Sequence, residues 1–303
     1  MLKNHRGELY LFLGAFTFSL NGIISTVVLK NLDAFRLAQI RAISAFLLLF
    51  IYALIFRRDL LVIKRNQIRS LIAYGIIGFA LVNVGYFLGI EREVPLGMVL
   101  IIEFTAPIWV VLWIKYVRKG FVARQMWVAI ALALIGLVLV SKVWAGFTFD
   151  LIGMGAALFS AFALTGYFLM GKKVTSERHP LSATIIGLGV AGAFWLVVLP
   201  VWNFPTEIFT KQIDIEGLAA GNLFPGWALL LYIIVMGTVV PYIFVISGLH
   251  LLSESKSSVM GMLEPVLASV FAWIWLNQSW DAVQLLGAVI VLSGVYLADK
   301  SKS

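Results

Sequence analysis

Residues 94–115 read VPLGMVLIIEFTAPIWVVLWIK, an apolar run that contains one acidic residue, Glu103, and a proline, Pro107, near its middle. A helix of roughly 20 apolar residues crosses the hydrocarbon core of a bilayer, which is about 30 Å thick. A carboxylate at that depth is costly, and proline lacks the N–H that a continuous helix requires. The stretch therefore predicts a transmembrane helix that is interrupted beside an ionisable group.

Similar apolar runs occupy nearly the whole chain. Its 303 residues are 61% hydrophobic and only 13% charged, which is too apolar for a soluble domain of this size. The sequence has no cysteine, which removes disulfides and thiolate ligands from consideration. We predict an all-α integral membrane protein with ten transmembrane helices, at about residues 8–29, 35–56, 68–89, 94–115, 124–142, 151–171, 182–202, 225–248, 254–276 and 282–298.

The longest connection between these helices covers residues 203–224. It is at most an interfacial helix, which would bury Ile208, Phe209, Ile213 and Ile215. Its proline and glycine content instead favours a plain connector.

Basic residues alternate between successive loops. The net charge of +8 raises the question of a nucleic-acid partner, so its distribution matters more than its sign. Lys and Arg gather before the first helix and after the second, fourth and sixth, whereas the intervening loops carry mostly Asp and Glu. This distribution follows the positive-inside rule, so we predict that both termini are cytoplasmic and that no nucleic acid is bound.

The sequence contains an internal repeat. Two halves, residues 1–148 and 149–303, each hold five predicted helices. Because five is odd, the halves are inverted relative to each other, which is the arrangement that allows alternating access around one site at the bilayer midplane. A transporter is the natural interpretation. A shift of 158 residues places Tyr74 on Tyr232, Asn83 on Pro241, Pro107 on Pro265, Leu134 on Leu292 and Gly136 on Gly294.

Three stretches carry a resemblance to a known family. MLEP at residues 262–265, LLGAVIVLSGVYL at 285–297 and IRAISAFLLLF at 40–50 resemble the EamA-type transporters of the drug/metabolite transporter superfamily. The resemblance implies a ten-helix carrier of the bacterial inner membrane that commonly exports amino acids or other small metabolites. The chain departs from the family after the fourth and ninth helices, where Lys119-Gly120 and Asn277-Gln278 stand in place of a frequent Gly-Glu pair.

Two glutamates lie at mid-depth in the predicted membrane. Glu103 is about 14 Å from the outer end of its helix, and Glu264 is equally central in the ninth helix. A carboxylate there should face a cavity, pair with a cation or be protonated. Pro107 and Pro265 remove backbone donors nearby, so each leaves a carbonyl for another helix, water or ligand. We predict that these prolines are hinges in the cavity wall, together with Pro241 and Gly261.

Further polar and aromatic residues reach a similar depth. The predicted substrate-binding set is Glu103, Glu264, Asn21, Asn83, Trp109, Tyr86, Tyr242 and Arg41. The hydroxyls of Ser160, Thr165 and Thr238 suit helix packing. A structural interpretation also stands, in which the prolines only kink packed helices and a glutamate pairs with Arg41.

From the two glutamates together with the resemblance we expect a secondary transporter that exports a small molecule, most suitably an amino acid or related amphoteric compound, and whose glutamates also exchange protons. Drugs, organic cations or nucleobase-like metabolites are alternative substrates. An integral-membrane enzyme is the alternative from another class, but the three histidines lie near helix ends and no metal-ligand spacing occurs, so we expect no cofactor and no metal. A channel is a third option. We expect a monomer or homodimer.

Overall fold

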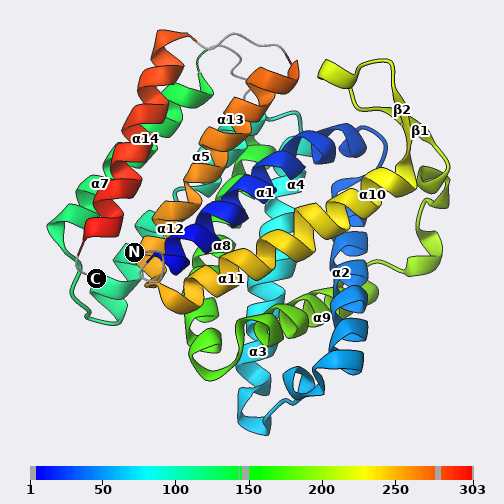
Figure 1. The fold of residues 1–303 in the computed structure, drawn as a ribbon, viewed down its shortest axis with the longest axis horizontal. Helices are drawn as coiled ribbons and strands as arrows, with labels where there is room; N and C mark the ends of the chain where they lie inside the picture. The colour runs from blue at the N-terminus through cyan, green and yellow to red at the C-terminus, as the bar shows by residue number, and fades with distance from the viewer. Residues whose placement is uncertain (1–4, 143, 145–149, 277–280, 302–303) are drawn as a thin grey trace.

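The computed structural model describes residues 5–142, 144, 150–276 and 281–301. Within them lie ten helical spans that are long and apolar enough to cross a membrane, one for each predicted window (Figure 1). The predicted fold class, an all-α membrane protein built from two inverted five-helix repeats, is confirmed. The predicted boundary between residues 148 and 149 lies outside the described residues, as do Asn277 and Gln278.

We number the spans 1 to 10 in chain order. Six of them are single helices: α1 (Arg6–Leu29), α2 (Ala34–Phe56), α7 (Arg124–Ser141), α8 (Leu151–Glu177), α9 (Pro180–Val198) and α14 (Ala282–Lys300). Spans 3, 4, 8 and 9 are composite. Span 3 comprises α3 (Ile68–Gly75), η4 (Ile76–Leu81) and α4 (Val82–Glu91), and span 4 comprises α5 (Leu96–Glu103), α6 (Ala106–Leu112) and η5 (Trp113–Val117). Span 8 comprises α10 (Gly226–Ile234), η10 (Val235–Val239) and α11 (Val240–Leu251), and span 9 comprises α12 (Glu254–Gly261) and α13 (Leu263–Leu276).

Two kinds of interruption fall at equivalent places in the two repeats, whereas the π-turn η5 at the end of span 4 has no counterpart in α13. Both η4 in span 3 and η10 in span 8 are π-turns, and the 158-residue shift places residues 77–81 of the first on 235–239 of the second. Span 4 breaks after Glu103 and span 9 after Gly261, which the same shift also superposes. Because π-turns and mid-helix breaks are uncommon, their coincidence supports the internal repeat strongly.

Each predicted kink proline lies just after an interruption. Pro107 is the second residue of α6, Pro265 the third of α13, and Pro241 the second of α11. The first turn of a helix has no internal partner for its N–H groups, so proline is accommodated there without losing a bond. The prolines therefore begin new helical segments, and their role as hinges stays a prediction.

Spans 5 and 10 pack together through a symmetric pair of glycine contacts. A Cβ on Gly136 of α7 would lie 2.6 Å from the carbonyl oxygen of Gly287, and one on Gly294 of α14 would lie 2.7 Å from that of Ala129. The 158-residue shift converts one contact into the other, which is what a twofold relation between the repeats requires. The backbones of α7 and α14 thus touch directly, and the pair lies side by side at one edge of the bundle (Figure 1).

Spans 1 and 6 show the same symmetry. Ser19 Oγ on α1 lies 2.6 Å from the carbonyl of Ala15 and 2.8 Å from that of Glu264. Thr165 Oγ1 on α8 lies 2.8 Å from the carbonyl of Ala161 and 3.3 Å from that of Ala106. The two accepting carbonyls, of Ala106 and Glu264, are equivalent at the 158-residue shift. The two hydroxyls that contact them, on Ser19 and Thr165, are 146 residues apart, so span 1 aligns with span 6 at a shift of 146 residues. The smaller shift arises because the connection after span 7 is longer than its counterpart after span 2.

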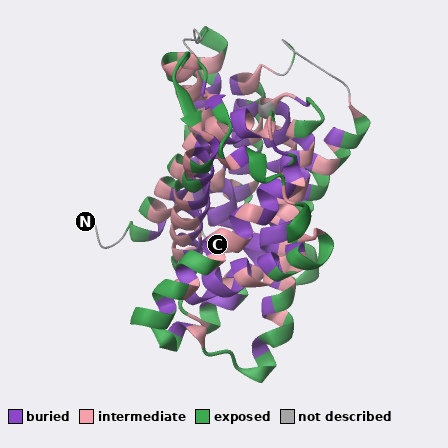
Figure 2. Ribbon diagram, turned by 90° about the vertical axis from the view of Figure 1, so that its right-hand side faces the viewer, coloured by how far each residue is buried: buried purple, intermediate pink, exposed green. Residues whose placement is uncertain are grey.

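Buried residues run through the centre of the bundle, between the repeats (Figure 2). The contacting spans pair across the repeats: α1 packs on α11, α4 on α8, and α2 on α9. Many large apolar side chains are exposed on the outside, among them Ile55 and Val197, which is 85% exposed. Such a surface suits a lipid environment, where exposing apolar groups carries no penalty.

The connection after span 7 is not an interfacial helix. It consists of short 3₁₀ turns and a hairpin in which β1 (Gln212–Asp214) pairs antiparallel with β2 (Leu223–Pro225). Gly217 and Gly221 adopt positive φ, which ends any helix in this region and closes the hairpin. The burial expected for three of the four apolar residues is nevertheless observed, at Ile208, Ile213 and Ile215.

Candidate functional site

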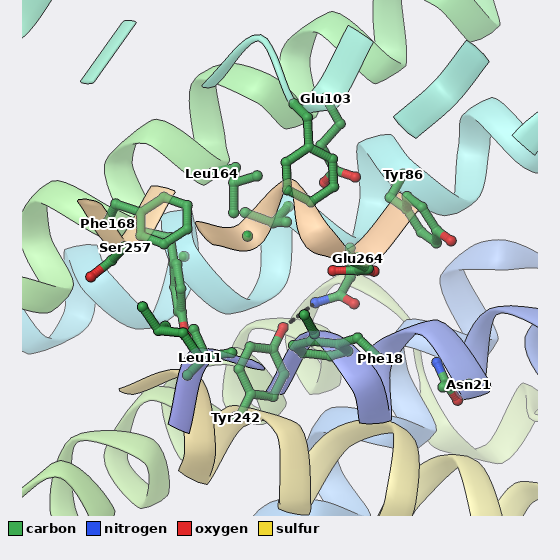
Figure 3. A pocket seen from close by; sticks show the side chains of 18 of the residues that line it. Leu11, Phe18, Asn21, Tyr86, Glu103, Leu164, Phe168, Tyr242, Ser257 and Glu264 are labelled. Atoms are coloured by element: carbon green, nitrogen blue, oxygen red, sulfur yellow. Dashed lines mark hydrogen bonds between the residues drawn. The ribbon is translucent and has the colours of Figure 1, made fainter. Parts of the chain in front are cut away.

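A cavity lies at the centre of the bundle and draws its walls from both repeats (Figure 3). It encloses about 850 Å³ of space free of atoms, part of it open to solvent. Of the predicted residues, the lining includes Asn21, Arg41, Asn83, Tyr86, Glu103, Tyr242, Gly261 and Glu264.

Glu103 enters the cavity from the break in span 4. It is the last residue of α5 and is only 6% exposed, and one of its carboxylate oxygens, Oε1, lies 2.6 Å from Ser160 Oγ on α8. The same hydroxyl lies 2.9 Å from the carbonyl oxygen of Val82. No basic side chain forms an ion pair with Glu103 in the part of the chain that the structure describes.

Glu264 enters the cavity from the break in span 9. It lies in the first turn of α13, where the unpaired N–H groups and the helix dipole favour a negative charge. Its side chain is partly exposed, and among the described residues it has neither a hydrogen-bond partner nor an ion-pair partner. The close view places it near the middle of the cavity, between Glu103 and Tyr242 (Figure 3). Its carboxylate is therefore available to a ligand.

Arg41 is held by the π-turn of span 8. Its Nε donates to Thr238 Oγ1 at 2.9 Å and its Nη2 donates to the carbonyl of Gly237 at 2.7 Å, while the guanidinium lies 5.0 Å from the ring centre of Phe87. A π-turn leaves carbonyls without the usual partner four residues on, which explains why an arginine is needed there. The ion pair between Arg41 and a glutamate, the structural alternative, is not present among the described residues.

In the π-turn of span 3, a side chain of the same span donates to the carbonyl that lacks its usual partner. Phe79 is the repeat equivalent of Gly237, and its carbonyl accepts a hydrogen bond of 2.7 Å from Asn83 Nδ2, which also lies 3.0 Å from the hydroxyl of Tyr242. The position equivalent to Asn83 in span 8 is Pro241, whose ring offers no donor. Arg41 therefore supplies from α2 what Asn83 supplies within its own span.

Asn21 is the remaining polar residue of the cavity from the predicted set. It is 5% exposed and abuts Gly237, and its Oδ1 has no hydrogen-bond partner in the described part of the chain. A buried amide oxygen without a partner is uncommon, and a ligand or water in the cavity would satisfy it. Tyr86 and Tyr242 flank the glutamates as aromatic walls (Figure 3).

The structure does not bring every predicted residue to the cavity. Trp109 packs against Phe162 with ring centres 4.8 Å apart and hydrogen-bonds Thr105, so it faces α8. Pro107, Pro241 and Pro265 are not among the residues that line the cavity. Sequence reasoning assigned Ser160 to packing, although it bonds Glu103, and it missed the apolar wall entirely because apolar side chains in a transmembrane helix carry no mark of which face they occupy. That wall includes Leu11, Phe18, Phe104, Leu164, Phe168 and Val245.

Comparisons with known proteins agree with this architecture. The model of the EamA-like transporter family matches residues 5–142 and again residues 151–298, once in each repeat. The inner membrane transporter YicL of Salmonella typhimurium is 23% identical over 98% of this chain and 96% of its own length. The threonine/homoserine exporter RhtA of Escherichia coli K12 is 27% identical over 76% of this chain and 71% of its own. A solved crystal structure covers 96% of both chains with a TM-score of 0.75 and 14% identity, which shows the shared fold.

Proposed function

Because this chain belongs to the EamA-like transporter family, we propose that it carries amino acids or related amphoteric metabolites out of the cell by alternating access around the central cavity. The observation that supports this substrate class is the presence of two carboxylates, Glu103 and Glu264, that form no ion pair with a basic side chain among the described residues. A cationic group on the substrate would supply the missing charge. The name of RhtA, an exporter of threonine and homoserine, favours the same class.

Glu264 is the better ligand for a substrate ammonium group. Its carboxylate has no partner among the described residues, whereas Glu103 is already bonded to Ser160. A charge-assisted hydrogen bond to the ammonium would form without breaking an existing contact.

The other end of an amphoteric substrate would meet Arg41 and Asn21. Two of the three guanidinium nitrogens of Arg41 are used by span 8, and Nη1 has no partner among the described residues, so it remains for a carboxylate. A positively charged guanidinium and two carboxylates thus line one cavity, which is the arrangement that the two opposite charges of a zwitterion require. Phe18 and Tyr242 would contact the apolar part of the substrate.

The breaks in spans 4 and 9 provide a route for alternating access. They lie at equivalent positions in inverted repeats, so a movement of α5 relative to α6 has a counterpart in α12 relative to α13. The proposed location is the bacterial inner membrane with both termini in the cytoplasm, and no catalysed reaction is part of the proposal.

Organic cations are the second candidate. The cavity holds two carboxylates but one guanidinium, and apolar and aromatic side chains form much of its wall, which suits an amphipathic cation. Such a substrate would depend on the glutamates and not on Arg41.

Counterflow in proteoliposomes tests both candidates. Vesicles containing the purified protein are loaded with unlabelled amino acids, organic cations or nucleobases, and entry of the labelled counterpart is followed with and without a pH gradient. We expect saturable exchange of amino acids. Exchange confined to cations would favour the second candidate, and flux that does not saturate would indicate a channel.

A further inference from the structure

Ser160 lies between two acceptors and has one proton to donate. Its hydroxyl is 2.6 Å from Glu103 Oε1 on α5 and 2.9 Å from the carbonyl oxygen of Val82, the first residue after the π-turn of span 3. Ser160 itself is fully buried, so no bulk water competes for the hydroxyl. A hydroxyl can rotate, and the partner it chooses depends on whether the carboxyl also holds a proton.

We propose that Ser160 transmits the protonation state of Glu103 to span 3 and thereby couples proton binding to the movement of the repeats. When Glu103 is charged, Ser160 donates to its carboxylate. When a proton enters from the cavity and binds Oε1, that O–H donates to Ser160 Oγ, and the serine hydroxyl turns to donate to the carbonyl of Val82. One proton is taken up and forms the O–H bond of Glu103, and every other change is a change of hydrogen bonds. The proposal rests on the transport function proposed above.

The contact between α4 and α8 beside Val82 is unusually close. A Cβ on Gly85 of α4 would lie 2.8 Å from the Cβ and 2.9 Å from the backbone nitrogen of Ser160, so the backbones of α4 and α8 approach each other at this point. A hydrogen bond from Ser160 to Val82 ties the two helices directly beside η4. Since π-turns are frequent at functional sites, a bond made or lost here is well placed to change how span 3 packs on span 6.

The other repeat provides an internal control. Glu103 is equivalent to Gly261 at the 158-residue shift, and Ser160 is equivalent to Gly14 at the 146-residue shift of span 6 on span 1. Both members of the acid–hydroxyl pair are therefore glycine in the second copy of the same contact. By contrast, the hydroxyl that only bonds backbone is present in both copies, as Ser19 and Thr165. The pair occurs as a unit, as expected if the two residues act together.

Several other ionisable groups share the cavity with Glu103. They are Arg41 on α2, Tyr86 on α4, Tyr167 on α8, Tyr242 on α11 and Glu264 on α13. Of the helices packed against α5, α7 carries one charged residue, Arg124, at its first position, and α8 carries Lys172, Lys173 and Glu177 near its last turns. One guanidinium, a second carboxylate and three phenols are the groups whose charge would alter the pH at which Glu103 binds a proton.

The test compares Ser160→Ala with Thr165→Val, which removes a hydroxyl about one and a half turns further along α8 that bonds only backbone carbonyls. Exchange at constant pH and accumulation driven by a pH gradient are both measured. We expect Ser160→Ala to exchange substrate normally but to lose gradient-driven accumulation by about tenfold, the equivalent of one hydrogen bond to a charged group. Thr165→Val should keep both activities. Normal accumulation in Ser160→Ala would overturn the proposal.

An infrared readout does not depend on transport. The carboxylic C=O band of protonated Glu103, identified by its absence in Glu103→Gln, should change frequency in Ser160→Ala and remain unchanged in Thr165→Val. Ser160→Cys keeps the volume with a weaker donor and should shift the band less, which serves if the alanine variant does not fold. If the wild type exchanges no substrate and the band is the same in Ser160→Ala as in the wild type, both proposals are rejected. If the wild type exchanges substrate and the band is the same in Ser160→Ala, only this proposal is rejected.

Discussion

Glu103 and Glu264 face the same cavity from equivalent breaks in the two repeats, yet they are not equivalent to each other. Glu103 ends α5 and corresponds to Gly261, whereas Glu264 opens α13 and corresponds to Ala106. A symmetric scaffold thus carries an asymmetric pair of acids, one bonded to Ser160 and one without a protein partner among the described residues. This difference is the basis of the proposed division of tasks, proton exchange at Glu103 and substrate binding at Glu264.

The hydrogen bonds between Arg41 and the π-turn of span 8 predict that a second substitution can restore stability lost when Arg41 is replaced. Arg41→Met should lower the free energy of unfolding by about 3 kcal/mol, because two charge-assisted hydrogen bonds are lost and the carbonyl of Gly237 loses its partner. Pro241→Asn introduces the donor that Asn83 provides at the equivalent position of span 3. The double variant should recover part of the loss in a denaturation experiment in detergent. A double variant less stable than Arg41→Met would contradict the repeat-based explanation.

The equivalence of Ser19 and Thr165 predicts matched effects on stability. Ser19→Ala and Thr165→Val each remove one buried hydroxyl that bridges to a carbonyl at the break of the opposite repeat, so each should lower the free energy of unfolding by about 1 kcal/mol. Ser293→Ala is the control, since that hydroxyl is exposed and bonds only Val289 in its own helix. Denaturant midpoints in detergent give the comparison, and losses that differ widely between the first two variants would argue against equivalent roles.

Close packing of spans 3 and 6 predicts that Gly85 does not tolerate a side chain. A Cβ there would collide with the carbonyl of Ala156, so Gly85→Ala should cost about 1–3 kcal/mol through overpacking. Gly155 on α8 has open space around its Cβ position, and Gly155→Ala should be neutral or stabilising by up to about 1 kcal/mol because alanine favours the helix. Thermal denaturation of the two variants measures the difference, and equal stabilities would mean that α4 and α8 do not touch as described.

Asp281 predicts a loss of stability in acid. It accepts hydrogen bonds from Lys142 at 2.8 Å and from the backbone of Gln284 at 2.9 Å, so it joins the ends of spans 5 and 10. The Lys142 hydrogen bond, followed by the backbone bond, lowers the pKa of Asp281 below its ordinary value of 3.8. A carboxyl whose pKa is lowered by folding stabilises the fold above its ordinary pKa, and this contribution disappears as the pH falls through the lowered value.

The measurement is an acid-denaturation profile of the wild type and of Asp281→Asn. The variant should be less stable at neutral pH, and the gap should close below about pH 4 as the wild-type carboxyl takes up its proton. A gap that stays constant through that range would show that the charge of Asp281 contributes nothing.

The sequence predicts the scaffold better than it predicts the site. Helix length and charge alternation locate all ten spans, and Pro107 and Pro265 mark the breaks within two or three residues because proline must follow the point where a helix restarts. The π-turns leave no such mark, so the carbonyl of Gly237 and its need for Arg41 were invisible. Trp109 was misplaced in the cavity because α6 is apolar all round, and nothing in an apolar helix indicates which face is turned inward.

Glu264 and Ser160 show which site residues can be identified from the sequence and which cannot. Glu264 is identifiable because a carboxylate at mid-membrane depth must have a reason to be there. Ser160 is not, because hydroxyls are common packing residues in membranes and only the geometry reveals that this one bonds a carboxylate.

The most direct test of the account is the concentration dependence of amino-acid counterflow in proteoliposomes containing either the wild type or Glu264→Gln. Glutamine keeps the size of the side chain and removes the charge that would hold the substrate ammonium. Loss of a charge-assisted hydrogen bond worth about 1.5–3 kcal/mol should raise the half-saturating concentration by roughly 10- to 150-fold. Glu216→Gln, on the exposed hairpin connection, is the control and should behave as the wild type. Saturable exchange in which Glu264→Gln leaves the half-saturating concentration unchanged would show that this carboxylate does not bind the substrate.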